Sequence, residues 1–397
     1  MPTAVVLARA GMKVVGVDVR EETVARINAG EAHIVEPDLD GLLHHVVREG
    51  KLRASTAPES ADVFVIAVPT PFQDGHVPDL SYVEAASRSV APHIEPGNLV
   101  VLESTVPPGA TEQMVSWILE ERPDLEPPGA GDSSFYAAHC PERVLPGRII
   151  VELVENDRAV GGVTEESSAV AKRFYQSFVR GECVTTTART AELAKLAENA
   201  YRDVNIAFAN ELSMIADRLD VDPWELISLA NRHPRVNILQ PGPGVGGHCI
   251  AVDPWFIVHA APEEARLIRS ARDTNLRKTD WVVERVAEVV QSLPRAAVVL
   301  CLGLTYKPNV DDVRESPAME VTRRLVERFG TRVWAVEPHL SGAAIAGINR
   351  VDLGAGLEAA HLVVGLVGHS VFRGLRPAPG ATLLDFTGIL QNAGAGG

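Results

Sequence analysis

The stretch TAELAKLAENAYRDVNIAFANELSMIADRL, residues 190–219, lies between two parts of the chain that share one pattern. It contains no Gly or Pro, and its apolar residues recur three and four positions apart. This spacing predicts one long amphipathic helix. We expect the helix to link the flanking domains and to pack against another subunit, so that the protein forms a homodimer or a higher homo-oligomer.

Short β-branched runs alternate with helical patterns before this helix, at residues 12–18, 63–68 and 99–103. Runs of this kind predict buried parallel strands with crossover helices between them. The alternation resumes after Pro294 in AAVVLCLGL, in a helical pattern near residues 317–329, and in RVWAVEP and HLVVGLVG.

The predicted fold class is therefore α/β, with two Rossmann-like doubly wound domains joined by a central helical domain. We place the first domain at residues 1–186, the central domain at 187–290 and the last domain at 291–397.

The composition restricts the partners of this chain. Its 397 residues carry 52 acidic and 37 basic side chains, a formal charge of −15 that would repel nucleic acid and anionic membranes. No long apolar run or signal-like segment is present, so we expect a cytoplasmic protein that binds neither membrane nor nucleic acid. The four cysteines lack the spacing of a metal site or a disulfide framework.

The run that ends at Val17 is followed by Asp18, where a Rossmann domain places the carboxylate that binds the adenosine ribose of NAD. A helix N-cap is the alternative role. A glycine-rich turn normally lies about 20 residues before this acid, and only seventeen residues precede it here. We therefore expect the first strand and the Gly-rich loop to be missing, the natural protein to begin upstream of Met1, and this chain to bind NAD poorly.

The loop PGPGVGGHCIAVDPW, residues 241–255, favours a reactive thiol. Its glycines, Gly246 among them, allow close backbone approach to a substrate and leave the Cys249 sulfur unobstructed. An inert thiol normally sits among larger apolar neighbours, as around Cys301. Asp253 could orient the thiol or a water, although an Asp before Pro is also a common turn or cap residue.

Two further sets of polar residues are candidates for catalysis. Lys195 and Asn199 are four residues apart on the long helix and share a face, where a cation and an amide would stabilise an oxyanion; a solvated lysine is the alternative. Thr105 and Glu142 follow predicted strand ends, where open α/β sheets place their ligand groups.

The chain also contains the motifs VPTP (residues 68–71), ESTVPPG, CPER, GPGVGGHCIAVDP and GLTYKPNVDDVRESP (303–317). Together with the Lys195/Asn199 helix, these motifs resemble the UDP-glucose/GDP-mannose dehydrogenase family over essentially the whole chain. The run around the thiol, with His248 before it, resembles the branch that acts on UDP-N-acetylhexosamines. Pro146 departs from the family pattern, because UDP-glucose enzymes have a second acidic residue there.

The resemblance implies an NAD domain, a central dimerisation domain and a UDP-binding domain. It places Thr70, Thr105 and Arg314 at the cofactor, and Lys307 and Glu142 at the UDP-sugar. Arg235 is similar to an arginine that reaches the neighbouring subunit's sugar site, although its interval to the thiol is shorter here than in the UDP-glucose branch.

The implied reaction is a four-electron oxidation of the C6 alcohol of UDP-N-acetyl-D-mannosamine through a thioester on Cys249, with UDP-N-acetylglucosamine or UDP-glucose as alternative substrates. Two readings compete with it. A two-electron hydroxyacid dehydrogenase shares the domain organisation, but its reaction does not require a cysteine in a glycine-rich loop. A UDP-sugar-binding form with impaired NAD binding would follow from loss of the Gly-rich loop.

Overall fold

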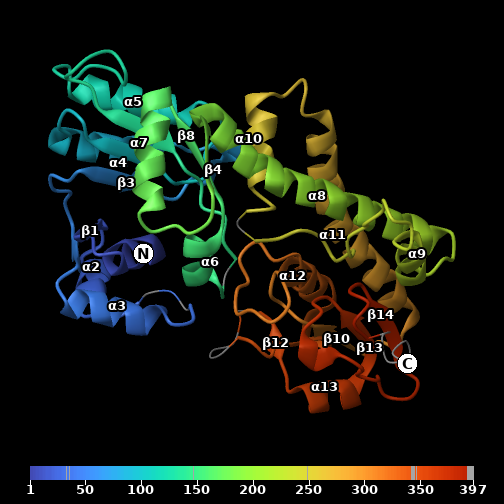
Figure 1. Cartoon of the computed structure of the whole chain (residues 1–397). Helices are drawn as coiled ribbons and strands as arrows, with labels where there is room; N and C mark the ends of the chain where they lie inside the picture. Colours follow the sequence, from blue (N-terminus) through green and yellow to red (C-terminus); the bar gives the residue numbers. More distant parts are fainter. Residues whose placement is uncertain are drawn as a thin grey trace. The chain divides into compact units, whose positions relative to one another are not determined.

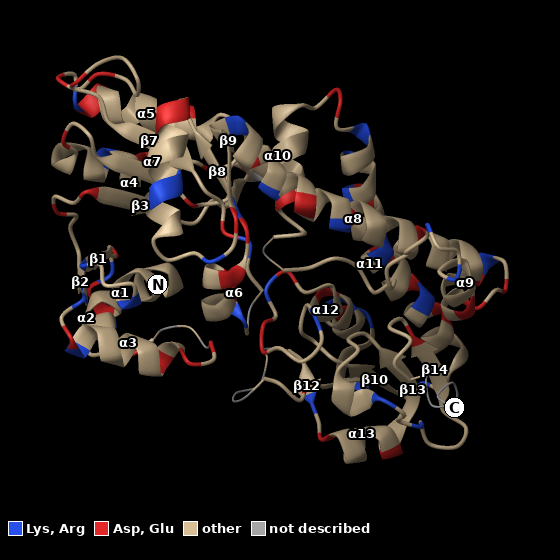
Figure 2. Ribbon diagram, in the orientation of Figure 1, with Lys and Arg blue, Asp and Glu red and all other residues tan. Residues whose placement is uncertain are grey.

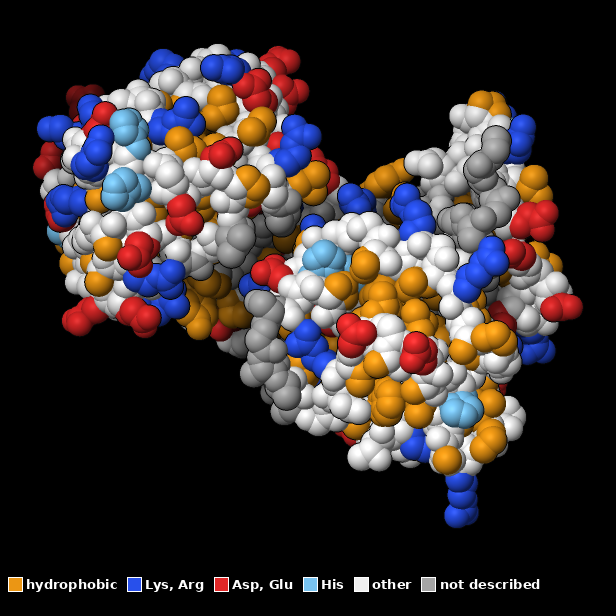
Figure 3. All heavy atoms as spheres, turned by 90° about the horizontal axis from the view of Figure 1, so that it is seen from below, with side chains coloured by type: hydrophobic (Ala, Val, Ile, Leu, Met, Phe, Trp, Pro, Cys, Tyr) orange, Lys and Arg blue, Asp and Glu red, His pale blue; other side chains and the backbone are white. Residues whose placement is uncertain are grey.

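The computed structural model describes residues 1–32, 34, 36–145, 147–247, 249–340, 345 and 347–390. The chain divides into two compact units, residues 1–197 and 198–397 (Figure 1). In both units basic and acidic side chains are interspersed, and both kinds are visible on the face drawn in Figure 3 (Figures 2 and 3). No helix among the described residues is long and apolar enough to cross a membrane.

Apart from a short hairpin, the strands described in the first unit form two separate sheets. β1 (Val14–Val17) pairs with β2 (Leu52–Ser55) in one small sheet. The second sheet has the order β3-β6-β7-β8-β9 and comprises Val63–Ile66, Leu99–Leu102, Tyr136–His139, Arg158–Gly162 and Cys183–Thr187. Its neighbours are parallel except β7 and β8, which are antiparallel, a departure that the sequence pattern did not predict.

Helices cover these strands where the sequence pattern predicts crossovers. They are α1 (Pro2–Arg9), α2 (Glu21–Asn28), α3 (Leu39–Arg48), α4 (Ser81–Val90), α5 (Ala110–Glu121), α6 (Ile149–Glu155) and α7 (Glu165–Gln176). The strands predicted at 12–18, 63–68 and 99–103 are confirmed as β1, β3 and β6. The short hairpin β4–β5 (Phe72–Gln73 and Val77–Pro78) follows β3.

No strand precedes α1 within the described residues, since α1 begins at Pro2. The predictions about a first strand and a Gly-rich loop concern sequence before Met1 and stay predictions.

The predicted long helix is confirmed as α8 (Ala188–Arg218), which runs from the first unit into the second. α9 (Pro223–Ala230), α10 (Asp253–Ala260) and α11 (Arg266–Ser292) follow it. Asp222 caps α9 by accepting from the backbone N–H groups of Trp224 and Glu225, and Pro223 occupies the first helical position, which explains why α9 begins there.

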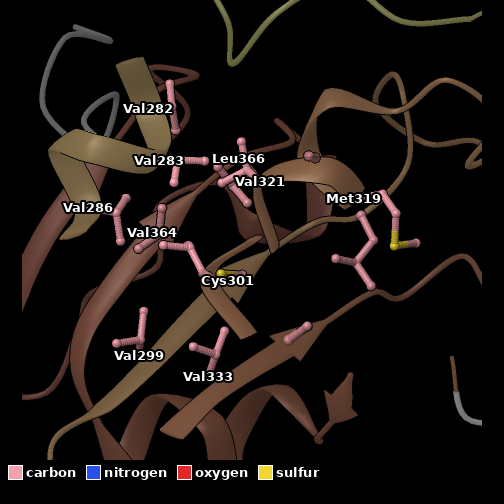
Figure 4. Close-up of a cluster of buried hydrophobic side chains, with 14 of the residues drawn as sticks. Val282, Val283, Val286, Val299, Cys301, Met319, Val321, Val333, Val364 and Leu366 are labelled. Atoms are coloured by element: carbon pink, nitrogen blue, oxygen red, sulfur yellow. The ribbon is translucent and has the colours of Figure 1, made fainter. Parts of the chain in front are cut away.

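The second unit ends in a five-stranded, all-parallel sheet with the order β12-β11-β10-β13-β14, and its three predicted strands are confirmed. The strands are Asn349–Arg350, Val333–Val336, Val298–Leu302, Ala360–Gly365 and Thr382–Asp385. α12 (Pro317–Phe329) has the bounds that the sequence predicted, and α13 (Leu353–Ala359) lies between β12 and β13 along the chain. Side chains of α11, α12 and the sheet form one core around Cys301 (Figure 4).

Candidate active site

The Cys249 thiol differs in environment from the other three cysteines. Cys249 is exposed, whereas Cys140, Cys183 and Cys301 are buried. Burial raises the pKa of Cys140 and Cys301 to about 12, so these thiols stay protonated and inert. The expectation that Cys301 is a packing residue is confirmed, and Cys249 is the thiol that a ligand can reach.

The glycines before Cys249 allow the loop to lie directly on the segment that follows β10. A Cβ on Gly246 would clash with the carbonyl oxygen of Glu315. Gly247 has a φ of +83°, and a Cβ there would lie 2.8 Å from the Tyr306 ring. The sequence predicted that these glycines serve a close backbone approach, and the structure shows an approach to the protein's own chain. The proposed contact of Gly246 with substrate stays a prediction.

α10 begins four residues after Cys249 and brings Asp253 to Asn199. The backbone N–H of Asp253 donates to the carbonyl of Cys249 at 2.8 Å, which closes the turn between the thiol and the helix. The Asn199 amide donates to the Asp253 carboxylate at 2.5 Å, and Asp253 is 2% exposed. The structure therefore joins two predicted site residues that lie 54 positions apart. Lys195 is one turn before Asn199 on α8 and is also buried.

The predicted residues of the first unit lie after the carboxyl ends of parallel strands, three of them in the five-stranded sheet and Asp18 in the separate β1–β2 sheet. Asp18 follows β1, Thr70 follows β3, Thr105 follows β6 and Glu142 follows β7. The Thr70 hydroxyl donates to the carbonyl of Thr105 at 2.7 Å. Desolvation raises the pKa of Glu142, against the opposing effect of positive charges that include Lys195. Glu142 is thus suited to exchange a proton or to orient a water.

Asp18 does not cap the following helix. α2 has Arg20 at its N-cap, and Asp18 Oδ1 accepts from the Arg20 backbone N–H at 2.9 Å and from its side chain at 3.3 Å. A carboxylate at the end of β1 and hydroxyls after β3 and β6 fit the adenosine-ribose and nicotinamide ends of a dinucleotide. The described residues before β1 form α1 and a turn at Gly11, and they contain no glycine-rich run ahead of α1.

Two buried carboxylates of the first unit were missed by sequence reasoning. Burial raises the pKa of Glu103 to about 7, with a further contribution from Glu142. Glu192, fully buried on α8, accepts from the backbone N–H groups of Gly109 and Thr111 and so ties α8 to the start of α5. The position of Glu103 directly after a strand could have singled it out, whereas nothing in the sequence pairs Glu192 with Gly109.

The remaining predicted residues lie in the second unit. Lys307 is half-buried in the segment after β10 that also carries Tyr306. Arg314 is largely exposed and forms an ion pair with Asp312 at 2.6 Å. Arg235 is exposed in the turn after α9. His248 and Pro146 lie outside the described residues. Among the residues that the structure does describe, no cluster of His, Cys, Asp or Glu could hold a metal ion.

Polar groups that follow parallel strands in the first unit are those expected of an NAD-linked dehydrogenase, and the second unit carries an exposed thiol four residues before α10. Family models give the same class. Residues 1–179 match the NAD binding domain of the UDP-glucose/GDP-mannose dehydrogenase family, 189–277 its central domain and 300–392 its UDP binding domain. The chain belongs to the UDP-glucose/GDP-mannose dehydrogenase family.

Individual relatives are similar along almost the whole chain. An NDP-N-acetyl-D-galactosaminuronic acid dehydrogenase from Ralstonia nicotianae is 56% identical, covering 94% of this chain and 89% of its own length. A UDP-N-acetyl-D-mannosamine dehydrogenase from Campylobacter jejuni is 52% identical, covering 94% and 93%. The solved structure of a UDP-D-ManNAc dehydrogenase from Pyrococcus horikoshii superposes with a TM-score of 0.88 at 39% identity, covering 100% of this chain and 94% of the other.

Proposed function

We propose that this protein is a cytoplasmic dehydrogenase that oxidises the C6 alcohol of UDP-N-acetyl-D-mannosamine to the carboxylate of UDP-N-acetyl-D-mannosaminuronate. The exposed Cys249 in its glycine loop is the observation on which the proposal rests. Relatives named for this substrate, 50–52% identical to the chain, support it. Each of the two oxidations transfers a hydride from C6 to NAD.

The first half of the proposed reaction forms an aldehyde. A proton leaves the C6 hydroxyl to a base network around Asp253 and Lys195, and C6 loses a hydride. The Cys249 thiolate then bonds to C6, and the carbonyl oxygen becomes an alkoxide. The ammonium of Lys195 and the amide of Asn199 would stabilise this charge, so the aldehyde stays attached to the enzyme.

The second half forms the acid. Loss of a second hydride from C6 restores the carbonyl and leaves a thioester on Cys249. A water oriented by Glu142 and Thr105 attacks the thioester carbon, the carbon–sulfur bond breaks, and the thiolate and the sugar carboxylate are released. The sum is one alcohol and one water converted to one carboxylate, with two hydrides and three protons released.

We assign the other predicted residues to the ligands. Asp18, Thr70, Thr105 and Arg314 would bind the cofactor. Lys307, Gly246 and Glu142 would bind the UDP-sugar, and Arg235 would serve the site of a neighbouring subunit.

We also infer that the protein is a homodimer or a higher oligomer formed through α8. Apolar side chains are exposed along this helix at seven-residue spacing: Tyr201 is 71% exposed, Phe208 57% and Ile215 45%. Residues seven apart on a helix share a face, so this stripe would be covered by a second copy.

The stoichiometry of the reaction tests the proposal. The protein is incubated with excess NAD and limiting UDP-N-acetyl-D-mannosamine, and NADH and sugar acid are counted. Two NADH per sugar are expected. One NADH per sugar would support a simple alcohol dehydrogenase, and tight UDP-sugar binding without NADH would support a binding protein with impaired NAD binding.

The sugar itself has a second candidate, because the Ralstonia relative at 56% identity is named for an N-acetylgalactosaminuronic acid. The same assay with UDP-N-acetylgalactosamine, UDP-N-acetylglucosamine and UDP-glucose ranks these substrates by kcat/KM. A higher value for any of them than for UDP-N-acetyl-D-mannosamine would replace the proposed substrate.

A further inference from the structure

Two buried ionisable residues of the last domain take no part in the proposed chemistry. Glu337 follows β11 and is 5% exposed, and His369 follows β13 and is fully buried. Their side chains meet, with His369 Nε2 3.1 Å from Glu337 Oε2. Buried polar side chains normally have a hydrogen-bond partner for each polar atom. The partners of this pair therefore identify the part of the chain whose position the pair fixes.

The partners of Glu337 and His369 lie at both ends of one short segment, residues 304–309. Glu337 Oε2 accepts from the backbone N–H groups of Leu304 at 2.7 Å and of Thr305 at 3.2 Å. At the other end, His369 Nδ1 accepts from the backbone N–H of Asn309 at 2.9 Å.

These contacts fix the protonation of the pair. Because Nδ1 accepts a hydrogen bond, the neutral imidazole of His369 carries its proton on Nε2 and donates it to Glu337. The other Glu337 oxygen accepts from the His339 backbone N–H at 2.9 Å. Desolvation raises the pKa of Glu337, but the hydrogen bonds from His369 and from the Leu304 and His339 backbone N–H groups together outweigh it and hold the pKa below its usual value. The pair therefore links three loops through a carboxylate.

The segment held in this way carries Lys307, which the proposed function assigns to the UDP-sugar. Lys307 lies at its centre, and the Thr305 hydroxyl donates to the Lys307 carbonyl at 3.0 Å. The neighbouring Tyr306 ring packs against Gly247, two residues before Cys249. Movement of residues 304–309 would displace the Lys307 ammonium.

We propose that Glu337 and His369 are positioning residues that hold residues 304–309 so that Lys307 is presented to the UDP portion of the substrate. Neither residue touches the substrate. This inference rests on the role of Lys307 in the proposed function. A purely structural pair would affect the free energy of unfolding and leave the affinity for the UDP-sugar unchanged.

The test is a double-mutant cycle on UDP-sugar affinity, measured by calorimetry on the full chain without NAD. His369→Ala removes both contacts, and His369→Gln keeps a donor toward Glu337. We expect His369→Ala to raise the Kd of UDP and of UDP-N-acetyl-D-mannosamine about tenfold, and His369→Gln to raise it less. Lys307→Ala should raise the Kd as well, and in its background the His369 changes should have no further effect.

Thr322→Val is the matched control, since its fully buried hydroxyl lies on α12, where it donates to the Ala318 carbonyl and also interacts with the Cys301 thiol. Its Kd should match the wild type. If Lys307→Ala binds normally, the assigned role of Lys307 and this inference both fail. If Lys307→Ala weakens binding but folded His369→Gln and His369→Ala do not, the inference alone is overturned. Equal effects of His369→Ala with and without Lys307 would also overturn it. Should His369→Ala not fold, His369→Gln decides.

Discussion

The side chains of Asn199 and Asp253 are joined by a hydrogen bond, with Nδ2 2.5 Å from Oδ2, and this bond fastens the long helix α8 to the helix that follows the thiol loop. Asp253 is 2% exposed, so its carboxylate depends on donors from the protein. The position of Cys249 relative to α8 is set partly by this contact, because the Asp253 backbone closes the turn onto the Cys249 carbonyl.

Replacing Asn199 by Ala should therefore reduce the free energy of unfolding by about 1–3 kcal/mol, because a buried carboxylate loses a donor. Urea unfolding followed by far-UV circular dichroism measures the loss. Asn205→Ala is the control: Asn205 lies on the same helix and donates only to its own turn, at the Tyr201 carbonyl. An equal decrease in the free energy of unfolding in the two variants would show that the Asn199–Asp253 hydrogen bond stabilises the fold no more than the Asn205 bond does.

Cys249→Ser should reduce acid formation more than about 1,000-fold, because a hydroxyl is a weaker nucleophile and an alkoxy ester hydrolyses slowly. Product is quantified by anion-exchange chromatography, and NADH by absorbance. Cys183→Ala, which removes a buried thiol at the start of β9, should cost about 1 kcal/mol of stability and leave the rate unchanged. Normal turnover of Cys249→Ser would rule out the thioester.

Gly246→Ala should destabilise the protein by about 1–3 kcal/mol and weaken UDP-sugar binding, since the added methyl group would clash with the Glu315 carbonyl. Gly242→Ala in the same loop provides the comparison, because its Cβ would meet no atom closer than 3.9 Å. Thermal unfolding and calorimetry report both effects. The seating of the loop on residues 306–317 is disproved if the two alanine variants behave alike.

Phe208→Glu should shift the protein toward the monomer, because the added charge would be buried in the proposed α8 interface. Sedimentation velocity over a concentration series measures the association. Gln291→Glu adds the same charge to an exposed position of α11 and should leave the association unchanged. An unaltered oligomer in Phe208→Glu would place the interface elsewhere.

Lys278 should make stability depend on pH. Lys278 is 2% exposed, and its Nζ donates to the Ser213 hydroxyl at 2.8 Å. Nζ also lies 3.9 Å from the centre of the Trp281 ring, and the residue lines a cavity of about 540 Å³. Desolvation lowers the pKa of Lys278 to about 7. Between pH 7 and the unfolded value of 10.5, the unfolded chain holds a proton that the folded chain lacks, so the free energy of unfolding rises with pH in this window.

One such proton contributes a slope of at most about 1.4 kcal/mol per pH unit. Lys278→Met should remove this contribution and should stabilise the protein most at pH 7. Urea unfolding from pH 7 to 10 measures the slope. Lys13→Met, at an exposed position, should keep the wild-type slope. If Lys278→Met also keeps the wild-type slope, the pKa of Lys278 is the same in the folded and the unfolded chain.

The order of helices and strands could be predicted from the sequence, because each element that is buried on one face or on both shows a characteristic spacing of apolar residues. The apolar spacing in residues 190–219 determined α8, and the β-branched runs determined β1, β3, β6 and the strands of the last domain. Small side chains around Cys249 likewise indicated an open thiol, and the structure places that thiol at the surface.

Only the tertiary structure decided which distant side chains meet. The Asn199–Asp253 bond spans 54 positions, the Gly109–Glu192 bond 83 and the Glu337–His369 contact 32. Such pairs depend on sheet order and on the way helices cross, which residue spacing does not encode. A glycine can likewise be recognised in the sequence, but whether it makes room for a ligand or for Glu315 depends on the chain that folds against it.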